Sequence, residues 1–262
     1  MPSTYAHRYF GEEVRSQLTG RAAEIIDYKR ELFDIGLHGP DILFYHKPLL
    51  YNQVNQLGRD MHREKGSRFF TDVKPLIETN DDPDGALSYI LGFICHFALD
   101  SVCHPYVDDA IRQTGVPHME IEAEFDKMLI RRDGFDPWAL DSASHLHGSA
   151  QSSKVIAPLL GVSERAADIA VKDMKKYAVF FTTTNPVTRG VVFFFLKISG
   201  LSKNIRGLFL NKTDHPKCKK CSLVLGQKLE EAVPIAVALI ANYLDFYENG
   251  VKLSDRFELT YD

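Results

Sequence analysis

Residues 91–109, LGFICHFALDSVCHPYVDD, combine an apolar helical surface with three polar side chains spaced four residues apart. These side chains are His96, Asp100 and His104, and Phe, Ile, Cys, Leu and Val surround them. Residues four apart lie on the same side of a helix, and polar groups on an apolar face need partners because their burial alone is costly. The stretch therefore predicts a buried helix whose polar groups bind one another, the backbone or a cation.

The composition predicts one globular domain. The chain has 262 residues, of which 45% are hydrophobic, so residues 1–262 can share one core. A net charge of −4 argues against a dedicated nucleic-acid scaffold, because such proteins are usually basic. No apolar run reaches the roughly 18 residues of a membrane span. The first residues, MPSTYAHRYFGEEVRSQ, resemble no signal peptide, so we expect a cytoplasmic protein.

The spacing of apolar residues is helical rather than alternating, which predicts an all-α fold, a single-domain multi-helix bundle. Glycine and proline punctuate the chain, and Pro105 is expected to end the buried helix. A loop is expected over residues 34–49 and a polar loop over residues 210–221. The expected helices cover residues 4–18, 20–33, 55–70, 71–78, 86–103, 117–134, 149–158, 163–183, 187–200 and 222–248.

A second pair of the same type follows on the next expected helix, where His118 precedes Glu122 by four residues. Imidazole and carboxylate are ligands that zinc favours outside structural cysteine sites. A single pair is more often a plain hydrogen bond. Two pairs and His104 in one short stretch favour a metal centre. Further candidates lie upstream, at His7, His38, Asp41, His46, Asp60 and His62.

These motifs resemble those of the zinc-dependent phospholipase C family, which is related in fold to the fungal zinc single-strand nucleases. The resemblance rests on TYAH, HGPDILFY, GRDMH, GFICHFALDSVCHPYVD and HMEIEAEFD, which follow one another through about residues 2–126. The second half of the chain matches only as further helices. The resemblance implies an all-α fold with about three zinc ions in a cleft that hydrolyses phosphate esters.

The resemblance also implies ligands for each zinc. They are Asp41, His62, His96 and Asp100 for the first zinc, His7 and the bridging Asp100 for the second, and His104, His118 and Glu122 for the third. His46 is an alternative to His62, which we prefer because it lies at the end of an expected helix. The gap between Asp100 and His104 is shorter than in the best-studied members of the family.

In the family, the second zinc also binds the amine and carbonyl of the first residue of the mature chain. Met1 precedes Pro2, a small residue that permits methionine removal, and Pro2 then stands five residues before His7, as in the fungal nucleases. A neutral amine is a good zinc ligand, and its ordinary pKa of about 8 makes deprotonation by the metal inexpensive. We therefore expect Pro2 to complete the second site.

The implied chemistry is hydrolysis of an anionic ester. Three Zn²⁺ ions carry more charge than Asp41, Asp100 and Glu122 return, which favours phosphate. Zinc lowers the pKa of bound water towards about 7, so a hydroxide between two zinc ions bridged by Asp100 is the expected nucleophile. Asp41 would orient it or act as base. Phospholipase C-type hydrolysis of a phosphodiester is the leading interpretation. A nuclease, a phosphomonoesterase or a non-catalytic metal- or phosphate-binding protein is the alternative.

The remaining motifs have plainer explanations. Cys218 and Cys221 in CKKC either bind a separate metal or lie in an ordinary loop, since a zinc site needs more ligands than they supply. His145 and His147 are expected on a surface loop, and His38 is expected to be structural.

Residues 191–202, VVFFFLKISGLS, are expected to form a core helix. A basic run follows, so contact with phospholipid or an anionic membrane surface is the alternative to a solvated face. The acidic residues Glu120, Glu124 and Asp126 are expected to face solvent or to support the ligands. The basic run consists of Lys203, Arg206, Lys212, Lys217, Lys219 and Lys220.

Overall fold

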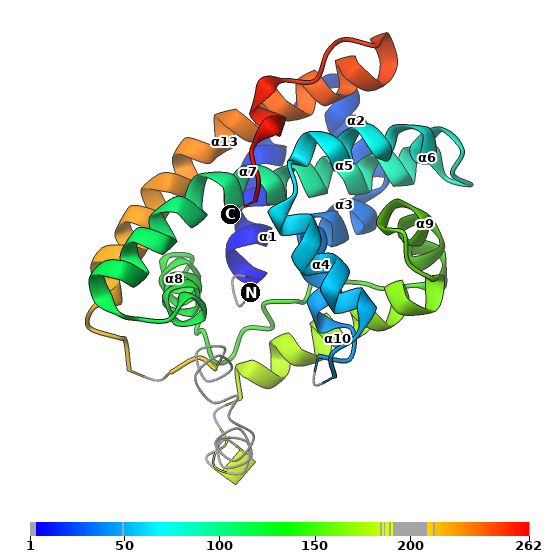
Figure 1. The fold of residues 1–262 in the computed structure, drawn as a ribbon. Coiled ribbons are helices and arrows are strands. Elements are labelled where there is room, and N and C mark those ends of the chain that lie inside the picture. The colour runs from blue at the N-terminus through cyan, green and yellow to red at the C-terminus, as the bar shows by residue number, and fades with distance from the viewer. Residues whose placement is uncertain are drawn as a thin grey trace.

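The computed structural model describes residues 4–48, 50–183, 185, 187–188, 190, 209–211 and 213–261. All regular structure in these ranges is helical, without a strand, which confirms the expected all-α fold (Figure 1). Pro2, most of the expected helix over residues 187–200 and part of the basic run lie outside the described residues.

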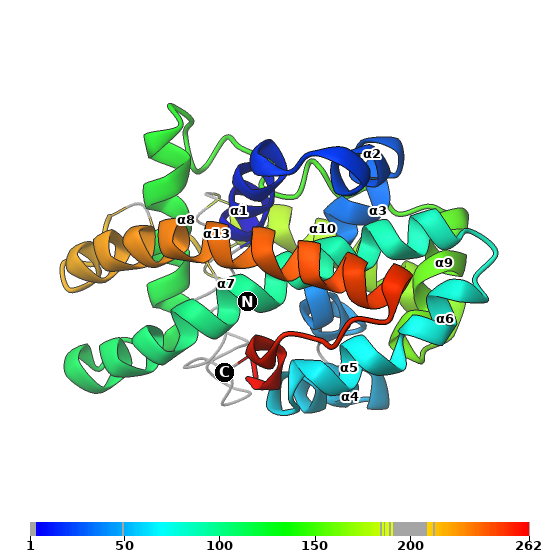
Figure 2. The same cartoon turned by 90° about the horizontal axis from the view of Figure 1, so that it is seen from above.

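The helices differ widely in length. The two 32-residue helices, α7 and α13, run side by side across the molecule (Figures 1 and 2). In chain order the elements are α1 Thr4–Gln17, α2 Gly20–Tyr28, α3 Arg30–Gly36, the 3₁₀-helix η1 Gly39–Tyr45, α4 Gln53–Arg63, α5 Gly66–Asp72, α6 Lys74–Glu78, α7 Pro83–Thr114, α8 His118–Arg132, α9 Ala150–Leu160, α10 Glu164–Phe181, α13 Cys218–Asn249 and the 3₁₀-helix η3 Asp255–Glu258.

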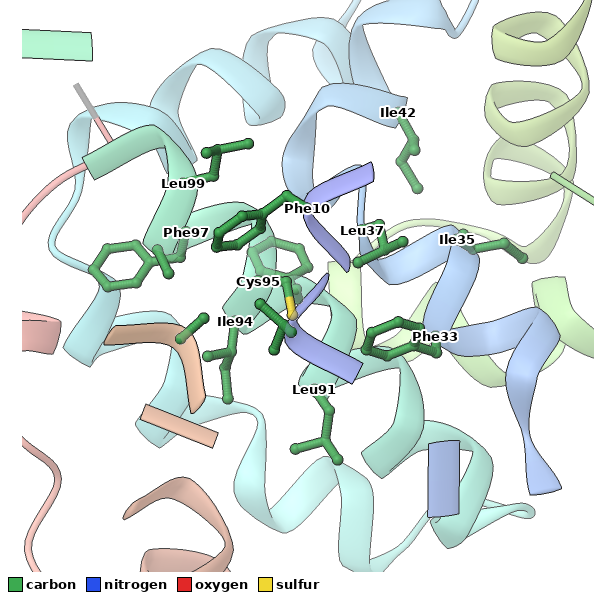
Figure 3. Packing of buried hydrophobic residues seen from close by; sticks show 14 of the residues in the cluster. Phe10, Phe33, Ile35, Leu37, Ile42, Leu91, Ile94, Cys95, Phe97 and Leu99 are labelled. Atoms are coloured by element: carbon green, nitrogen blue, oxygen red, sulfur yellow. The ribbon is translucent and has the colours of Figure 1, made fainter. Parts of the chain in front are cut away.

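Helix α7 is the centre of the core because every residue from Gly85 to Ser101 is buried, so this part of the helix is covered on all sides. By length and composition it could cross a membrane, but 94% of its most apolar window is buried inside the fold, as in the core helix of a globular protein. It packs mainly against α3 and α13. Figure 3 shows part of this core, where Phe10 of α1 and Phe33 of α3 join Cys95 and Phe97 of α7 in one cluster.

The expectation that Pro105 ends this helix is wrong. Helix α7 continues to Thr114 and ends at Gly115, whose φ of 69° lies in the left-handed region. Proline removes one backbone donor and leaves the carbonyl four residues earlier without its helical partner. Pro105 lies on an exposed face of α7, and the following residues Val107 and Ala110 are buried. Packing of the last turns therefore outweighs the lost hydrogen bond.

Several other expected helix boundaries are wrong, because contacts between distant parts of the chain decide where these helices begin and end. The helix expected over residues 20–33 is broken at Lys29, and the helix expected over residues 55–70 is broken before Gly66. Gly66 instead donates its N–H to the carbonyl of Leu259, 2.9 Å away. Helix α13 begins at Cys218, inside the expected polar loop. These contacts join residues far apart in sequence, so local spacing does not predict them.

Helices α3 and α7 approach closely at a pair of glycines. A Cβ on Gly36 would overlap the carbonyl oxygen of Tyr89, and a Cβ on Gly92 would overlap the carbonyl oxygen of Phe33. Any larger residue would therefore push two backbones apart. This contact fixes the height of α7 relative to α3 and to the 3₁₀-helix that follows α3.

We expect Gly92→Ala to lower the free energy of unfolding by about 3 kcal/mol, because the methyl group meets backbone that cannot yield. Gly226→Ala is the matched control in α13. Its Cβ would meet only Met128 Cε at 3.5 Å, so the better helix propensity of alanine should raise stability by about 0.5–1 kcal/mol. Urea denaturation of both variants measures the difference. Equal stability of the two would contradict the close approach.

Candidate metal centre

Three groups of ligand-type side chains lie beside α7, and within each group the ligand atoms lie within 4.8 Å of one another. Helices α1, η1, α4, α7 and α8 supply them. The first group is Asp41, His62 and His96, the second is His7, His96 and Asp100, and the third is His104, His118 and Glu122. The structure thus brings together all the residues implied by the resemblance except Pro2, which lies outside the described residues.

Asp100 occupies the middle of the arrangement. Its Oδ2 atom lies 3.0 Å from His96 Nε2, and its Oδ1 atom lies 3.4 Å from His7 Nε2 and 3.8 Å from His104 Nε2. The rings of His7 and His96 stack with centroids 4.4 Å apart. One carboxylate therefore faces imidazoles of two neighbouring groups, and its two oxygens can serve different cations.

Asp41 and His62 face each other at the first group, with Asp41 Oδ1 2.9 Å from His62 Nε2 and 4.0 Å from His96 Nε2. The backbone before Asp41 comes close to the His96 ring at Gly39, which has a φ of 46° and whose Cβ would overlap that ring. Glycine is needed there for both reasons.

The first group contains His62 and excludes His46. His62 Nδ1 donates to the carbonyl of Gly58 at 2.7 Å, which leaves Nε2 facing Asp41. His46 instead places Nδ1 3.2 Å from Asn52 Oδ1, and it belongs to none of the groups found among the described residues. The geometry therefore agrees with the choice of His62, while its role as a zinc ligand stays a prediction.

The third group lies between α7 and α8. Glu122 Oε1 is 2.9 Å from His118 Nε2 and 3.6 Å from His104 Nε2. The short gap between Asp100 and His104 is one helical turn, so α7 continues without a loop from the second group to the third. His104 Nδ1 donates to the backbone carbonyl of Tyr261 at 2.9 Å and turns Nε2 towards Glu122.

The charges of these groups suit metal ligands, which must be deprotonated. Burial alone would raise the pKa of the Asp100 carboxyl, but His96 and His104 outweigh it and hold that pKa far below its usual range. The pKa of Glu122 is likewise lowered, because His118 and His104 outweigh burial. Burial and then His96 lower the pKa of His7 to about 4, so its imidazole is neutral at pH 7. His62 is the exception, because the Asp41 carboxylate outweighs burial and raises its pKa, so a cation would have to displace a proton there.

The residues fit a bound cation. Within the described part of the chain, several buried polar atoms here make no hydrogen bond, namely His7 Nδ1, Asp41 Oδ1, His62 Nε2, His96 Nδ1, His96 Nε2 and Asp100 Oδ2. His62 Nε2 lies 2.9 Å from Asp41 Oδ1, and His96 Nε2 lies 3.0 Å from Asp100 Oδ2, but neither pair is aligned for a hydrogen bond. A buried polar atom without a partner costs about 1–3 kcal/mol. Coordination by imidazole and carboxylate, the donor set of zinc, would remove that cost.

The sequence comparisons agree with this geometry. A model of the family described as zinc dependent phospholipase C matches residues 6–175. The chain belongs to the zinc-dependent phospholipase C family. The resemblance stated above is therefore confirmed, and membership supports a zinc-dependent hydrolase. The number of zinc ions stays a prediction. No curated protein and no solved structure matches the chain.

Asp126, which lies within the matched residues, positions the start of α1 in this member of the zinc-dependent phospholipase C family. Asp126 is buried and accepts hydrogen bonds from the backbone N–H groups of Tyr5 and Ala6, at 3.1 Å and 2.9 Å. Helix α1 begins at Thr4, and its first N–H groups have no partner within the helix. Asp126 supplies that partner and so holds α1, with His7, against α8. The alternative that Asp126 faces solvent is wrong.

The surface position expected for His145 is wrong. His145 is buried, with its Nε2 2.8 Å from Nε2 of His38, which is also buried as expected of a structural residue. Burial lowers the pKa of His145 to about 3, and burial also holds the pKa of His38 well below its usual value. Two neutral imidazoles can share one proton in this pair. His147 is exposed, as expected for a surface loop.

Cys218 and Cys221 form part of the first turn of α13, so the plain-loop interpretation is wrong. Both are buried free thiols, and burial raises the pKa of Cys218 to about 12. The Cys221 thiol donates to the carbonyl of Lys217 at 3.5 Å. Among the described residues, no third ligand-type side chain groups with them, so they pack as small apolar side chains.

We expect Asp100→Asn to lose two of three zinc ions and Glu122→Gln to lose only one, because Asp100 faces two groups and Glu122 faces one. Elemental analysis of zinc-saturated protein after gel filtration gives the counts. Glu124→Gln is the control, since Glu124 is a buried carboxylate of the same helix that pairs with Lys127 at 2.7 Å instead. It should keep all zinc. An equal loss in the Asp100 and Glu122 variants would contradict the shared-ligand assignment.

Proposed function

We propose that this member of the zinc-dependent phospholipase C family hydrolyses a phosphodiester by phospholipase C-type chemistry. The observation that carries the proposal is Asp100, whose two oxygens lie 3.0 Å from His96 Nε2 and 3.4 Å from His7 Nε2. A carboxylate shared in this way suits two adjacent cations, the arrangement used to clamp a phosphate in two-metal hydrolases. The third group, between α7 and α8, adds a further candidate cation site beside it.

When bound, zinc supplies Lewis acidity and lowers the pKa of a bound water. The side chains of the protein determine where in the site a zinc-bound water and a substrate would lie. Asp100, Asp41 and Glu122 would hold the cations without neutralising them fully, so the loaded site would attract an anionic substrate. Asp41, next to His62 and His96, is placed to orient a water molecule or accept its proton.

A small cavity between the second and third groups supports the same assignment. It measures about 20 Å³, which is room for about one water molecule. Four of its lining side chains are imidazoles or carboxylates of the two groups, and the others are apolar or thiol side chains. Its lining residues are Ala6, His7, Leu99, Asp100, Cys103, His104, Val107, Glu122, Phe125 and Leu225.

We expect zinc-loaded protein to hydrolyse phosphatidylcholine faster than single-stranded DNA or 4-nitrophenyl phosphate. Chelation should abolish the activity, and re-addition of zinc should restore it. Asp41→Asn should lower kcat/KM at least about 100-fold, a general acid–base contribution, and the neighbouring His46→Ala should change it little. Cleavage of DNA alone would make the protein a nuclease, and cleavage of the monoester alone a phosphomonoesterase. Binding of zinc without any turnover would favour a non-catalytic binding protein.

We also propose that the protein touches anionic membrane surfaces through the basic run at the start of α13. Lys219 and Lys220 are exposed there. An exposed lysine near an anionic leaflet contributes about 1 kcal/mol to binding.

Binding to phosphatidylserine-containing vesicles should therefore weaken as salt rises, because salt screens exposed charges. The double variant K219Q/K220Q should bind roughly tenfold or more weakly, and E230Q, an exposed change on the same helix, should not weaken binding. Sedimentation with the vesicles measures this. Absence of binding at low salt would leave these lysines as an ordinary solvated face.

A further inference from the structure

We infer that residues 259–261, which follow η3, are a positioning element of the metal centre. They set the orientation of His104 and bind the backbone at His62. The inference rests on the zinc sites proposed for these two histidines, but not on the reaction. The family match ends at residue 175, so this segment lies outside the part of the chain that the family defines.

The segment returns from the end of α13 to the middle of the molecule. Figures 1 and 2 show the chain after α13, which passes through η3 and then the segment, leaving the far end of α13 and reaching α7, where the described chain ends. Two backbone hydrogen bonds attach the segment to the helices that carry the site. Leu259 accepts from Gly66 N–H at 2.9 Å, and Tyr261 donates its N–H to the carbonyl of His62 at 3.3 Å. Gly66 opens α5 and His62 lies near the end of α4, so the segment spans the break between these helices.

The Tyr261 carbonyl acts on the third group. It accepts the Nδ1 proton of His104 at 2.9 Å across 157 positions of sequence. A neutral imidazole has one proton, so the hydrogen bond at Nδ1 makes Nε2 the unprotonated nitrogen, the one that carries a lone pair. Nε2 of His104 lies 3.6 Å from Glu122 Oε1 and 3.8 Å from Asp100 Oδ1. The carbonyl therefore selects the tautomer of His104 that can bind a metal.

The side chain of Tyr261 holds the segment in place. Its ring is 1% exposed and lies edge-on to Phe97, with centroids 5.0 Å apart. The ring also lies 5.5 Å from the ring of His62 and 6.0 Å from that of His96, so it backs two ligands of the first group. Phe257 anchors η3, just before the segment, because its buried ring stacks on that of Phe97 with centroids 5.6 Å apart. A segment held this firmly can fix a hydrogen-bond acceptor at the site.

The decisive measurement is the tautomer of His104 in zinc-free native protein. Long-range ¹⁵N–¹H correlation spectra of histidine rings distinguish the two neutral tautomers, and assignment uses the His104→Gln variant. We expect the proton on Nδ1. A proton on Nε2 would overturn the inference without any variant of the segment having to fold.

A variant that stops after Leu259 tests the consequence. It should lose the Nδ1 tautomer preference of His104, and the third zinc should bind about 10–100-fold more weakly in competition with a chelating indicator. Tyr261→Phe keeps the ring and both backbone hydrogen bonds, so it should match the native protein in tautomer and affinity. A folded stop variant with native tautomer and native affinity would overturn the inference.

The outcomes separate this inference from the proposed function. Absence of phosphodiester turnover would remove the proposed reaction and leave the tautomer and zinc affinity unchanged. Absence of zinc binding by the native protein would remove the proposed zinc centre, and with it the role of the segment, whatever the tautomer.

Discussion

An ionised carboxylate in the most apolar helix of the molecule must be surrounded by compensating groups, and Asp100 on α7 is that carboxylate. Burial of an isolated charge is costly, and a buried charge that loses its partner destabilises a protein by about 3–5 kcal/mol. Three imidazoles surround it, with Nε2 of His96 at 3.0 Å, of His7 at 3.4 Å and of His104 at 3.8 Å. The Asp100 Oδ2 atom nevertheless makes no hydrogen bond, so a bound cation would complete the compensation. Two of the imidazoles come from α7 itself and the third from α1. The packing of α1 on α7 and the charge of the site are therefore one constraint.

The direction of two of the imidazoles, those of His62 and His104, follows from a hydrogen bond on the far side of the ring. The Gly58 carbonyl holds Nδ1 of His62, and the Tyr261 carbonyl holds Nδ1 of His104, at 2.7 Å and 2.9 Å. One carbonyl is local, one helical turn away in α4, and the other comes from the end of the described chain. The break between α4 and α5 belongs to the same arrangement, because it exposes the N–H of Gly66 to the returning segment. A boundary that looks like an interruption of one helix is thus part of the support of the site.

Sequence spacing predicted the parts of this site that are local. Side chains four residues apart on one helix are neighbours wherever that helix lies, so the pairs on α7 and α8 could be found without a structure. Asp126, His145 and Tyr261 could not, because their partners lie about 107–157 positions away. Pro105 misled for the opposite reason. Proline does cost α7 one backbone hydrogen bond. Packing of the buried residues after Pro105 nevertheless extends the helix to Thr114.

Helix α8 illustrates why an acidic motif need not be a solvated face. Glu122 and Asp126 are four residues apart, and both are buried, one towards His118 and the other under the first turn of α1. On another side, Lys127 is 1% exposed and pairs with Glu124 at 2.7 Å. Each buried acid thus has its own cation, imidazole or backbone donor, as buried charges require. Because one helix holds a ligand of the third group and the start of α1, a shift of α8 would move His7 and Glu122 together. The second and third groups therefore keep their separation, which a substrate bound to both would need.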